Sequence, residues 1–139
     1  MKRKLFLLVL PALFLMSCGD DDESGTIYTI PETSAPYNLV NVSGSIVGVS
    51  HDFEPRTITW KFNTDQTVTV VNNNTNEDAE DFFESGTYEL SYQPAEYTPA
   101  PCEENLFIDN IDFGCVNATD SGLILTQAVA DGYVLTFIK

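Results

Sequence analysis

The single histidine of this 139-residue chain is the first place where residue types and spacing could do chemistry. His51 is followed by Asp52 and then by Glu54, so an imidazole base oriented by a carboxylate is conceivable. Adjacent residues of an extended chain point to opposite sides, however, and no recognisable motif ties a serine or cysteine to His51. The sequence therefore predicts a protein that is not an enzyme, with His51 as a solvated loop residue.

A second polar segment has the residue types of a cation site. Residues 72–78 read Asn-Asn-Asn-Thr-Asn-Glu-Asp and offer hard oxygen ligands of the kind that calcium prefers. The segment lacks the glycine that stands at the sixth position of a helix-flanked calcium loop. Weak calcium binding by the loop of residues 72–85 stays open, but the sequence predicts no dedicated metal site and no cofactor.

The first of the three cysteines follows an N-terminal apolar stretch. Residues 2–4 are basic, and residues 5–16 form an apolar stretch that is too short to span a bilayer of about 30 Å. Residues 15–18, Leu-Met-Ser-Cys, resemble the bacterial lipobox, which implies that residues 1–17 are a lipoprotein signal peptide and that Cys18 is lipidated. Several acyl chains would make such an anchor stable. The alternative is an ordinary secretory signal with a chance cysteine.

Residues 18–36 are predicted to form a flexible tether between this lipidated cysteine and the folded domain. Four consecutive acidic residues, 20–23, repel one another and extend the chain. An acidic run at this place resembles the export signal of surface-displayed lipoproteins in some Gram-negative bacteria, which implies an outer-membrane protein exposed on the cell surface. As a simple spacer, the run would leave the domain facing the periplasm.

The charge balance limits the kinds of partner. Three of the six basic residues lie in residues 1–17, so beyond the signal peptide only three basic residues accompany all 21 acidic ones. Lysine and arginine supply the electrostatic attraction for nucleic acids and anionic membrane surfaces. Nucleic acid is therefore not an expected partner, and contact with the membrane is expected only through the lipid anchor.

From residue 37 onward the apolar residues alternate with polar ones, which is typical of half-buried strands. Arg56 to Phe62 is the clearest case, with Ile58 and Trp60 on one face. Short connections imply antiparallel neighbours. The sequence predicts an all-β fold for residues 37–139, an eight-stranded antiparallel up-and-down barrel with strands at residues 37–42, 56–62, 67–71, 86–92, 105–108, 111–116, 122–126 and 133–138.

The order of these pieces resembles the lipocalin-like domains of bacterial lipoproteins. The resemblance covers residues 37–139 and is carried by the segments 37–42, 58–70, 86–88, 123–125 and 131–135. It implies binding of a small hydrophobic or amphipathic molecule, with a mouth shaped by the loops 44–55 and 72–85. Candidate wall residues are the inward aromatic side chains Trp60, Tyr88, Tyr92 and Phe113. Alternatively, these aromatics fill the barrel and the outer loops contact another envelope protein.

Cys102 and Cys115 remain as a pair in a compartment that permits disulfides. A two-residue turn at Asp109–Asn110 would place Cys115 opposite Glu104, diagonal to Cys102. Diagonal neighbours lie about 7 Å apart at Cβ, whereas a disulfide needs about 3.5–4.5 Å. A bulge or a bend at Pro101 must therefore close the gap. The alternative is two free buried thiols.

Overall fold

A computed structural model describes residue 30 and residues 35–95, 102–127 and 129–139. Every regular element in this part of the chain is a β-strand, and no helix there has the length and apolar character that crossing a membrane requires. The predicted signal peptide and Cys18 lie outside the described residues, as does most of the predicted tether. The strands are β1 (Tyr37–Gly44), β2 (Val49–Asp52), β3 (Ile58–Phe62), β4 (Thr67–Asn72), β5 (Gly86–Pro94), β6 (Glu104–Ile108), β7 (Ile111–Ala118), β8 (Gly122–Thr126) and β9 (Tyr133–Ile138).

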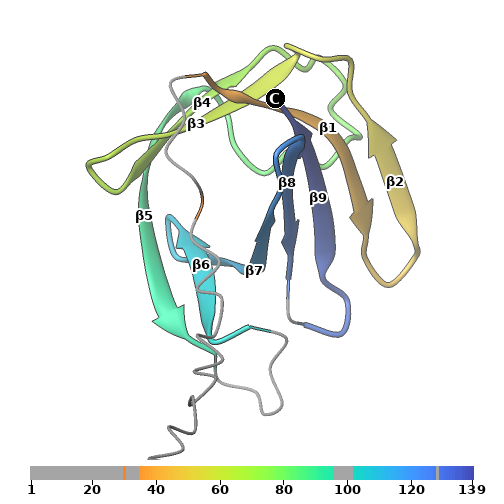
Figure 1. The fold of residues 1–139 in the computed structure, drawn as a ribbon. Helices are drawn as coiled ribbons and strands as arrows, with labels where there is room; N and C mark the ends of the chain where they lie inside the picture. Colours follow the sequence, from red (N-terminus) through yellow and green to blue (C-terminus); the bar gives the residue numbers. More distant parts are fainter. Residues whose placement is uncertain (1–29, 31–34, 96–101, 128) are drawn as a thin grey trace, which may run out of the picture.

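The strands form one antiparallel sheet that closes on itself (Figure 1). Neighbours follow chain order from β3 to β9, and the pairing of β9 with β1 completes the circle. On its other side β1 pairs with β3 through residues 37–39 and with β2 through residues 41–44. The fold is therefore a closed barrel of eight antiparallel strands, as predicted, and β2 is an additional strand.

All eight predicted strands are present with small changes at their ends. β3 begins at Ile58 and not at Arg56, because Arg56 has a left-handed backbone with φ 74°. The additional strand β2 lies within the predicted loop of residues 44–55. It is only four residues long and, among the described residues, pairs with β1 alone. Its short alternation gives a weak signal in the sequence, and this is why it was not predicted.

The core lies inside the barrel, because one face of each strand points inward. Ile58, Trp60 and Phe62 alternate with exposed or half-buried neighbours along β3, as predicted. The remaining buried hydrophobic residues come from most of the other strands and two loops: Tyr37, Leu39, Val42, Phe53, Val68, Val70, Phe83, Leu106, Ile108, Phe113, Val116, Leu123, Leu125, Leu135 and Phe137.

A β-bulge in β1 changes which of its residues point into the barrel, and a second bulge lies in the β6–β7 pair. In β1 the register with β9 shifts between Leu39 and Asn41, so Leu39 and Val42 are both buried although they are three residues apart. The carbonyl of the extra residue, Val40, accepts a hydrogen bond from Phe53 N at the break between β2 and β3, at 2.9 Å. A bulge leaves one residue of a strand without a paired residue opposite. Here that residue, Val40, bonds to the backbone between β2 and β3, the two strands that lie along this side of β1.

The closing pair of strands needs a glycine. Gly44 has φ 138°, and a Cβ atom added there would lie 2.3 Å from the carbonyl oxygen of Gly132. The contact lies where the ends of β1 and β9 meet, at the pair Gly44 and Tyr133. A side chain at position 44 would therefore push the two closing strands apart.

The connections alternate between the two ends of the barrel, because consecutive strands run in opposite directions, except that β2 and β3 both run antiparallel to β1. One end, here called the β3–β4 end, has the turn of residues 63–66, the turn of residues 119–121 and the start of β1. The opposite end, here called the β4–β5 end, has the long loop of residues 73–85, the β1–β2 turn of residues 45–48 and the β8–β9 loop.

Candidate functional site

Trp60 lies at the centre of the barrel interior and is fully buried. Its ring centroid lies 5.0–6.4 Å from the centroids of four other rings, those of Phe62, Phe83, Phe113 and Phe137. Tilted and edge-on arrangements at these distances are favourable for aromatic side chains. The space around the indole ring is therefore occupied by side chains of the protein itself.

Phe83 differs from the other rings because it comes from a loop and not from a strand. Its ring lies 4.4 Å from that of Tyr88, 5.5 Å from that of Trp60 and 5.8 Å from that of Phe113. These are three of the four residues predicted to form the walls of a ligand site. The structure brings the three together, and the side chain that they surround is Phe83.

The fourth predicted wall residue, Tyr92, lies at the β3–β4 end. Its hydroxyl accepts a hydrogen bond of 3.3 Å from the backbone N–H of Ile30. Burial raises the pKa of this phenol; the charge of Glu104 also raises it, and the hydrogen bond from Ile30 opposes them. Tyr92 belongs to a separate, open pocket of about 260 Å³ lined by Ile30, Phe62, Asn63, Thr64, Gln66, Leu90 and Tyr92.

Two polar atoms are buried in the barrel without a hydrogen-bond partner among the described residues. They are the hydroxyl of Tyr37 and the Nε1 atom of Trp60, on neighbouring strands where these two residues pair. Burial also raises the pKa of Tyr37. An unpaired buried donor costs about 1–3 kcal/mol, so such atoms call for an explanation beyond stability.

Replacing Tyr37 with phenylalanine is expected to stabilise the fold. The change removes the unpaired hydroxyl and keeps the ring, so the free energy of unfolding should rise by up to about 1 kcal/mol near neutral pH. Because burial raises the folded pKa of Tyr37, ionisation of this phenol favours the unfolded chain as pH rises above about 10, and the variant lacks this loss of stability.

Urea unfolding at about pH 8 and about pH 11 tests this expectation, since the advantage of Tyr37→Phe over the wild type should grow with pH. A variant less stable than the wild type at the lower pH would mean that the hydroxyl has a partner, such as a buried water molecule.

His51 lies on β2, opposite Val42 of β1. The carboxylate of Asp52 is engaged elsewhere, because Asn41 Nδ2 donates a hydrogen bond of 2.8 Å to Asp52 Oδ1. His51 is half-buried while Asp52 is exposed, so the two side chains follow the alternation of a strand. The prediction that His51 lies in a loop is wrong, and Asp52 does not orient its ring.

The asparagine-rich loop is held by its own hydrogen bonds. The side-chain oxygens of Asn72, Asn74 and Asn76 each accept a bond from the backbone N–H two residues on, at 2.8–3.1 Å. Asn72 and Asn74 also donate through Nδ2 to Asp81 Oδ2, at 2.8 and 3.0 Å. Among the described residues there is no group of three or more His, Cys, Asp or Glu side chains that could hold a metal ion.

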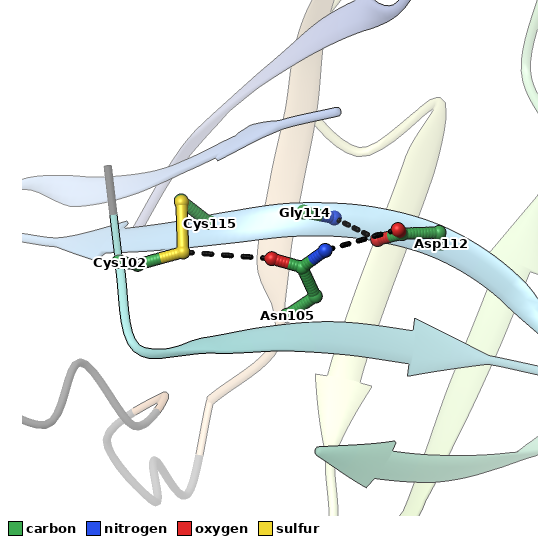
Figure 2. The surroundings of a disulfide bond; sticks show 5 residues. All are labelled: Cys102, Asn105, Asp112, Gly114 and Cys115. Atoms are coloured by element: carbon green, nitrogen blue, oxygen red, sulfur yellow. Dashed lines mark hydrogen bonds between the residues drawn. A yellow bond between two sulfur atoms is a disulfide. The ribbon is translucent and has the colours of Figure 1, made fainter. Parts of the chain in front are cut away.

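Cys102 and Cys115 form the predicted disulfide, with Cα atoms 5.7 Å apart (Figure 2). The Asp109–Asn110 turn pairs Ile108 with Ile111, as expected, but the register then shifts by one residue. Leu106 lies opposite Gly114, so the predicted pairing of Cys115 with Glu104 is wrong. The shift is a bulge, one of the two devices expected to bring the cysteines together.

Asp112 of β7 stabilises this bulge through two hydrogen bonds, one within β7 and one to β6 (Figure 2). Its carboxylate accepts hydrogen bonds from Gly114 N, at 2.6 Å, and from Asn105 Nδ2, at 3.0 Å. Asn105 Oδ1 lies 3.6 Å from Cys102 Sγ, a sulfur that carries no proton in the disulfide. Gly114 has φ 64°, a conformation that glycine adopts without steric cost. The disulfide and the Asp112 contacts therefore fix the same bulge.

Phe82 and Phe83 were missed as site residues. In the sequence they stand alone among acidic residues, in a loop that was expected to shape the mouth of the barrel. Their two adjacent aromatic rings in an otherwise polar loop are the signal that could have identified them. Comparison of the chain with protein-family models, with curated proteins and with solved structures finds no match.

Proposed function

We propose that this protein is a lipid-anchored lipoprotein of the bacterial outer membrane whose lipocalin-like barrel binds a small hydrophobic or amphipathic molecule. The anchor in this proposal is Cys18, and the acidic tether carries the barrel away from the membrane. Display on the cell surface follows from the resemblance of the acidic run to an export signal.

One observation carries the binding proposal. Trp60, Tyr88 and Phe113 come from three different strands and surround a ring that belongs to a loop. Ligand sites are apolar, largely aromatic spaces with a few polar groups that fix orientation. The three side chains supply such walls, and the unpaired Trp60 Nε1 and Tyr37 hydroxyl supply polar groups.

Native mass spectrometry of protein purified from its own membrane tests the proposal. We expect a bound small molecule that is released on unfolding. A wild-type protein that carries no small molecule, and takes up none from an extract of the organism's medium and membranes, would contradict the binding function.

Anchoring has a separate test in Cys18→Ser. This substitution removes the acceptor of the lipid, so the protein should move from the membrane fraction to the soluble fraction. The variant has no acceptor for any of the acyl chains that make the anchor stable, so the expected loss is close to complete. Fractionation after a high-salt wash measures it, and a variant that stays with the membranes would refute the lipobox assignment.

A second candidate function is contact with another envelope protein. It is favoured by Ile46 and Val47, which are 82% and 78% exposed at the tip of the β1–β2 hairpin. The outer edge of β2 is also unpaired among the described strands. An envelope protein that co-purifies with the wild type and is lost in Ile46→Asp/Val47→Asp, but is kept in the exposed-loop control Val129→Asp, would favour this function.

A further inference from the structure

We propose that Phe82 and Phe83 form a displaceable plug in the barrel, and that the ligand which takes their place is a small, neutral aromatic molecule carrying a hydrogen-bond acceptor. This inference rests on the proposed binding function and adds two features to it: a gate and a ligand class. It is argued from the loop that carries the plug, the backbone at Phe82, and the chemistry of the surrounding side chains.

The plug belongs to a loop that takes no part in strand pairing. β4 ends at Asn72 and β5 begins at Gly86. Between them Phe82 and Phe83 are the only large apolar residues. Phe83 is buried in the core, and Phe82 lies 5.1 Å from Phe113 and 5.4 Å from Tyr133 between ring centroids. The plug can therefore leave without breaking any strand pairing.

The backbone at the plug is in a rare conformation. Phe82 has φ 63°, and Phe83 N donates a hydrogen bond of 2.8 Å to the carbonyl oxygen of Asp81, two residues earlier. This is a tight γ-turn with a positive φ at its centre, which is strained and uncommon for a bulky residue. Such strain persists only where surrounding contacts maintain it, so leaving the barrel would relieve it.

Side chains of Asn72, Ser85 and Tyr88 link the plug loop to the barrel: the Ser85 hydroxyl bonds to the backbone of Asn72, and the Tyr88 hydroxyl donates to the carbonyl oxygen of Glu84 at 2.9 Å. Of the three, Asn72 bonds to Phe83 itself. Asn72 Nδ2 donates to the carbonyl oxygen of Phe83 and to Asp81 Oδ2, each at 2.8 Å. Asn72 lies at the end of β4 and contributes no ring to the aromatic cluster. A change at this residue would therefore loosen the plug while leaving the walls of the site intact.

The chemistry of the vacated space defines the ligand class. Rings from Trp60, Tyr88 and Phe113 now enclose the ring of Phe83, so an aromatic ring of similar size fits between them. The unpaired Nε1 atom of Trp60 can only donate a hydrogen bond. A ligand with an acceptor, which a phenylalanine side chain lacks, would satisfy this donor.

Charge around the plug disfavours an anion. The loop carries five acidic residues, Glu77, Asp78, Glu80, Asp81 and Glu84, and the sequence has no lysine or arginine between Lys61 and Lys139. A carboxylate on the ligand would meet like charges at the β4–β5 end and find no described cation in the barrel interior. A neutral acceptor such as a ketone or an ether fits the site.

The test uses acetophenone, an aromatic ketone, with ethylbenzene as the probe that lacks the acceptor. Trp60 is the only tryptophan, so its indole N–H gives a single signal in a ¹H–¹⁵N NMR spectrum. The proteins are the wild type, Phe83→Ala, Asn72→Ala and the control Phe107→Ala. Phe107 is half-buried on β6 between the inward residues Leu106 and Ile108, so the control removes the same side chain from the outer face.

We expect Phe83→Ala to bind acetophenone at least about tenfold more tightly than the wild type, because the site no longer has to be vacated. The indole N–H signal should move downfield with acetophenone and much less with ethylbenzene. Asn72→Ala should fall between the wild type and Phe83→Ala, and Phe107→Ala should match the wild type. If Phe83→Ala does not fold, Asn72→Ala carries the test.

Other results would overturn the inference. Equal affinity in the wild type and both loop variants would mean that the plug does not occupy the site, even if the native protein carries a ligand. Equal indole shifts with both probes would reject the acceptor requirement. If the native protein carries a ligand while folded Phe83→Ala and Asn72→Ala bind neither probe, the binding function stands and the plug and ligand class fail.

Discussion

Trp60→Ala is expected to remove a large part of the stability of the fold. Trp60 is fully buried and contacts four other rings, so the substitution removes both its buried surface and the packing of its neighbours. Truncation of a large aromatic residue in a core costs about 3–5 kcal/mol, compared with about 5–15 kcal/mol for the whole stability of a typical domain. Urea unfolding followed by far-ultraviolet circular dichroism measures the loss.

Two further variants identify the cause of that loss. Lys61→Ala changes the next residue of β3, which is exposed, and should leave the free energy of unfolding nearly unchanged. Trp60→Phe should cost less than Trp60→Ala, because it keeps most of the ring volume and removes the unpaired N–H. If alanine is tolerated at position 60 as well as phenylalanine, the interior is not the packed aromatic core described above.

Loss of the disulfide should have the next largest effect. The bond joins Cys102 and Cys115, 13 residues apart in the sequence, and holds Cys102, just before β6, to β7. In the chain-entropy model a loop of this length contributes about 3 kcal/mol, so Cys102→Ser/Cys115→Ser should lower the free energy of unfolding by about that amount. Urea unfolding of the Cys18→Ser protein, with and without the added double substitution, provides the comparison.

Reduction gives the matching control. A thiol reductant should destabilise the protein that retains Cys102 and Cys115 and leave the double variant unaffected. Thiol counting on the unfolded, unreduced Cys18→Ser protein should find no reactive thiol. Two reactive thiols there, or a double variant as stable as its parent, would contradict the structural role of the bond.

The strands could be predicted because apolar and polar residues alternate along each of them, and this alternation can be recognised without knowing the partner strand. Ile58, Trp60 and Phe62 predict one face of β3, and the same pattern gives seven more strands. The bulge in β1 could not be predicted in the same way. Leu39 and Val42 are three residues apart and both buried, and the reason is the pairing of β1 with β9, which is far away in the sequence.

The inward position of three of the four predicted wall residues could be read from the sequence, but not the separate pocket of Tyr92 or the ring that lies between the other three. Trp60, Tyr88 and Phe113 follow from strand alternation, since each was expected to face inward. The position of Phe83 depends on how the loop after β4 folds back into the barrel, and its acidic neighbours indicate only a solvated segment. A local pattern therefore locates the lining of a barrel more easily than what fills it.

The place where the chain enters the barrel has a consequence for how a ligand arrives. Ile30 contacts Tyr92 at the β3–β4 end, and a stretch from Cys18 to Ile30 can span at most about 40 Å. A barrel anchored through Cys18 would be attached at that end, and the plug lies at the other end. A molecule that displaces Phe83 would then have a route from solution that does not pass through the bilayer, so the site would be open to dissolved aromatic compounds.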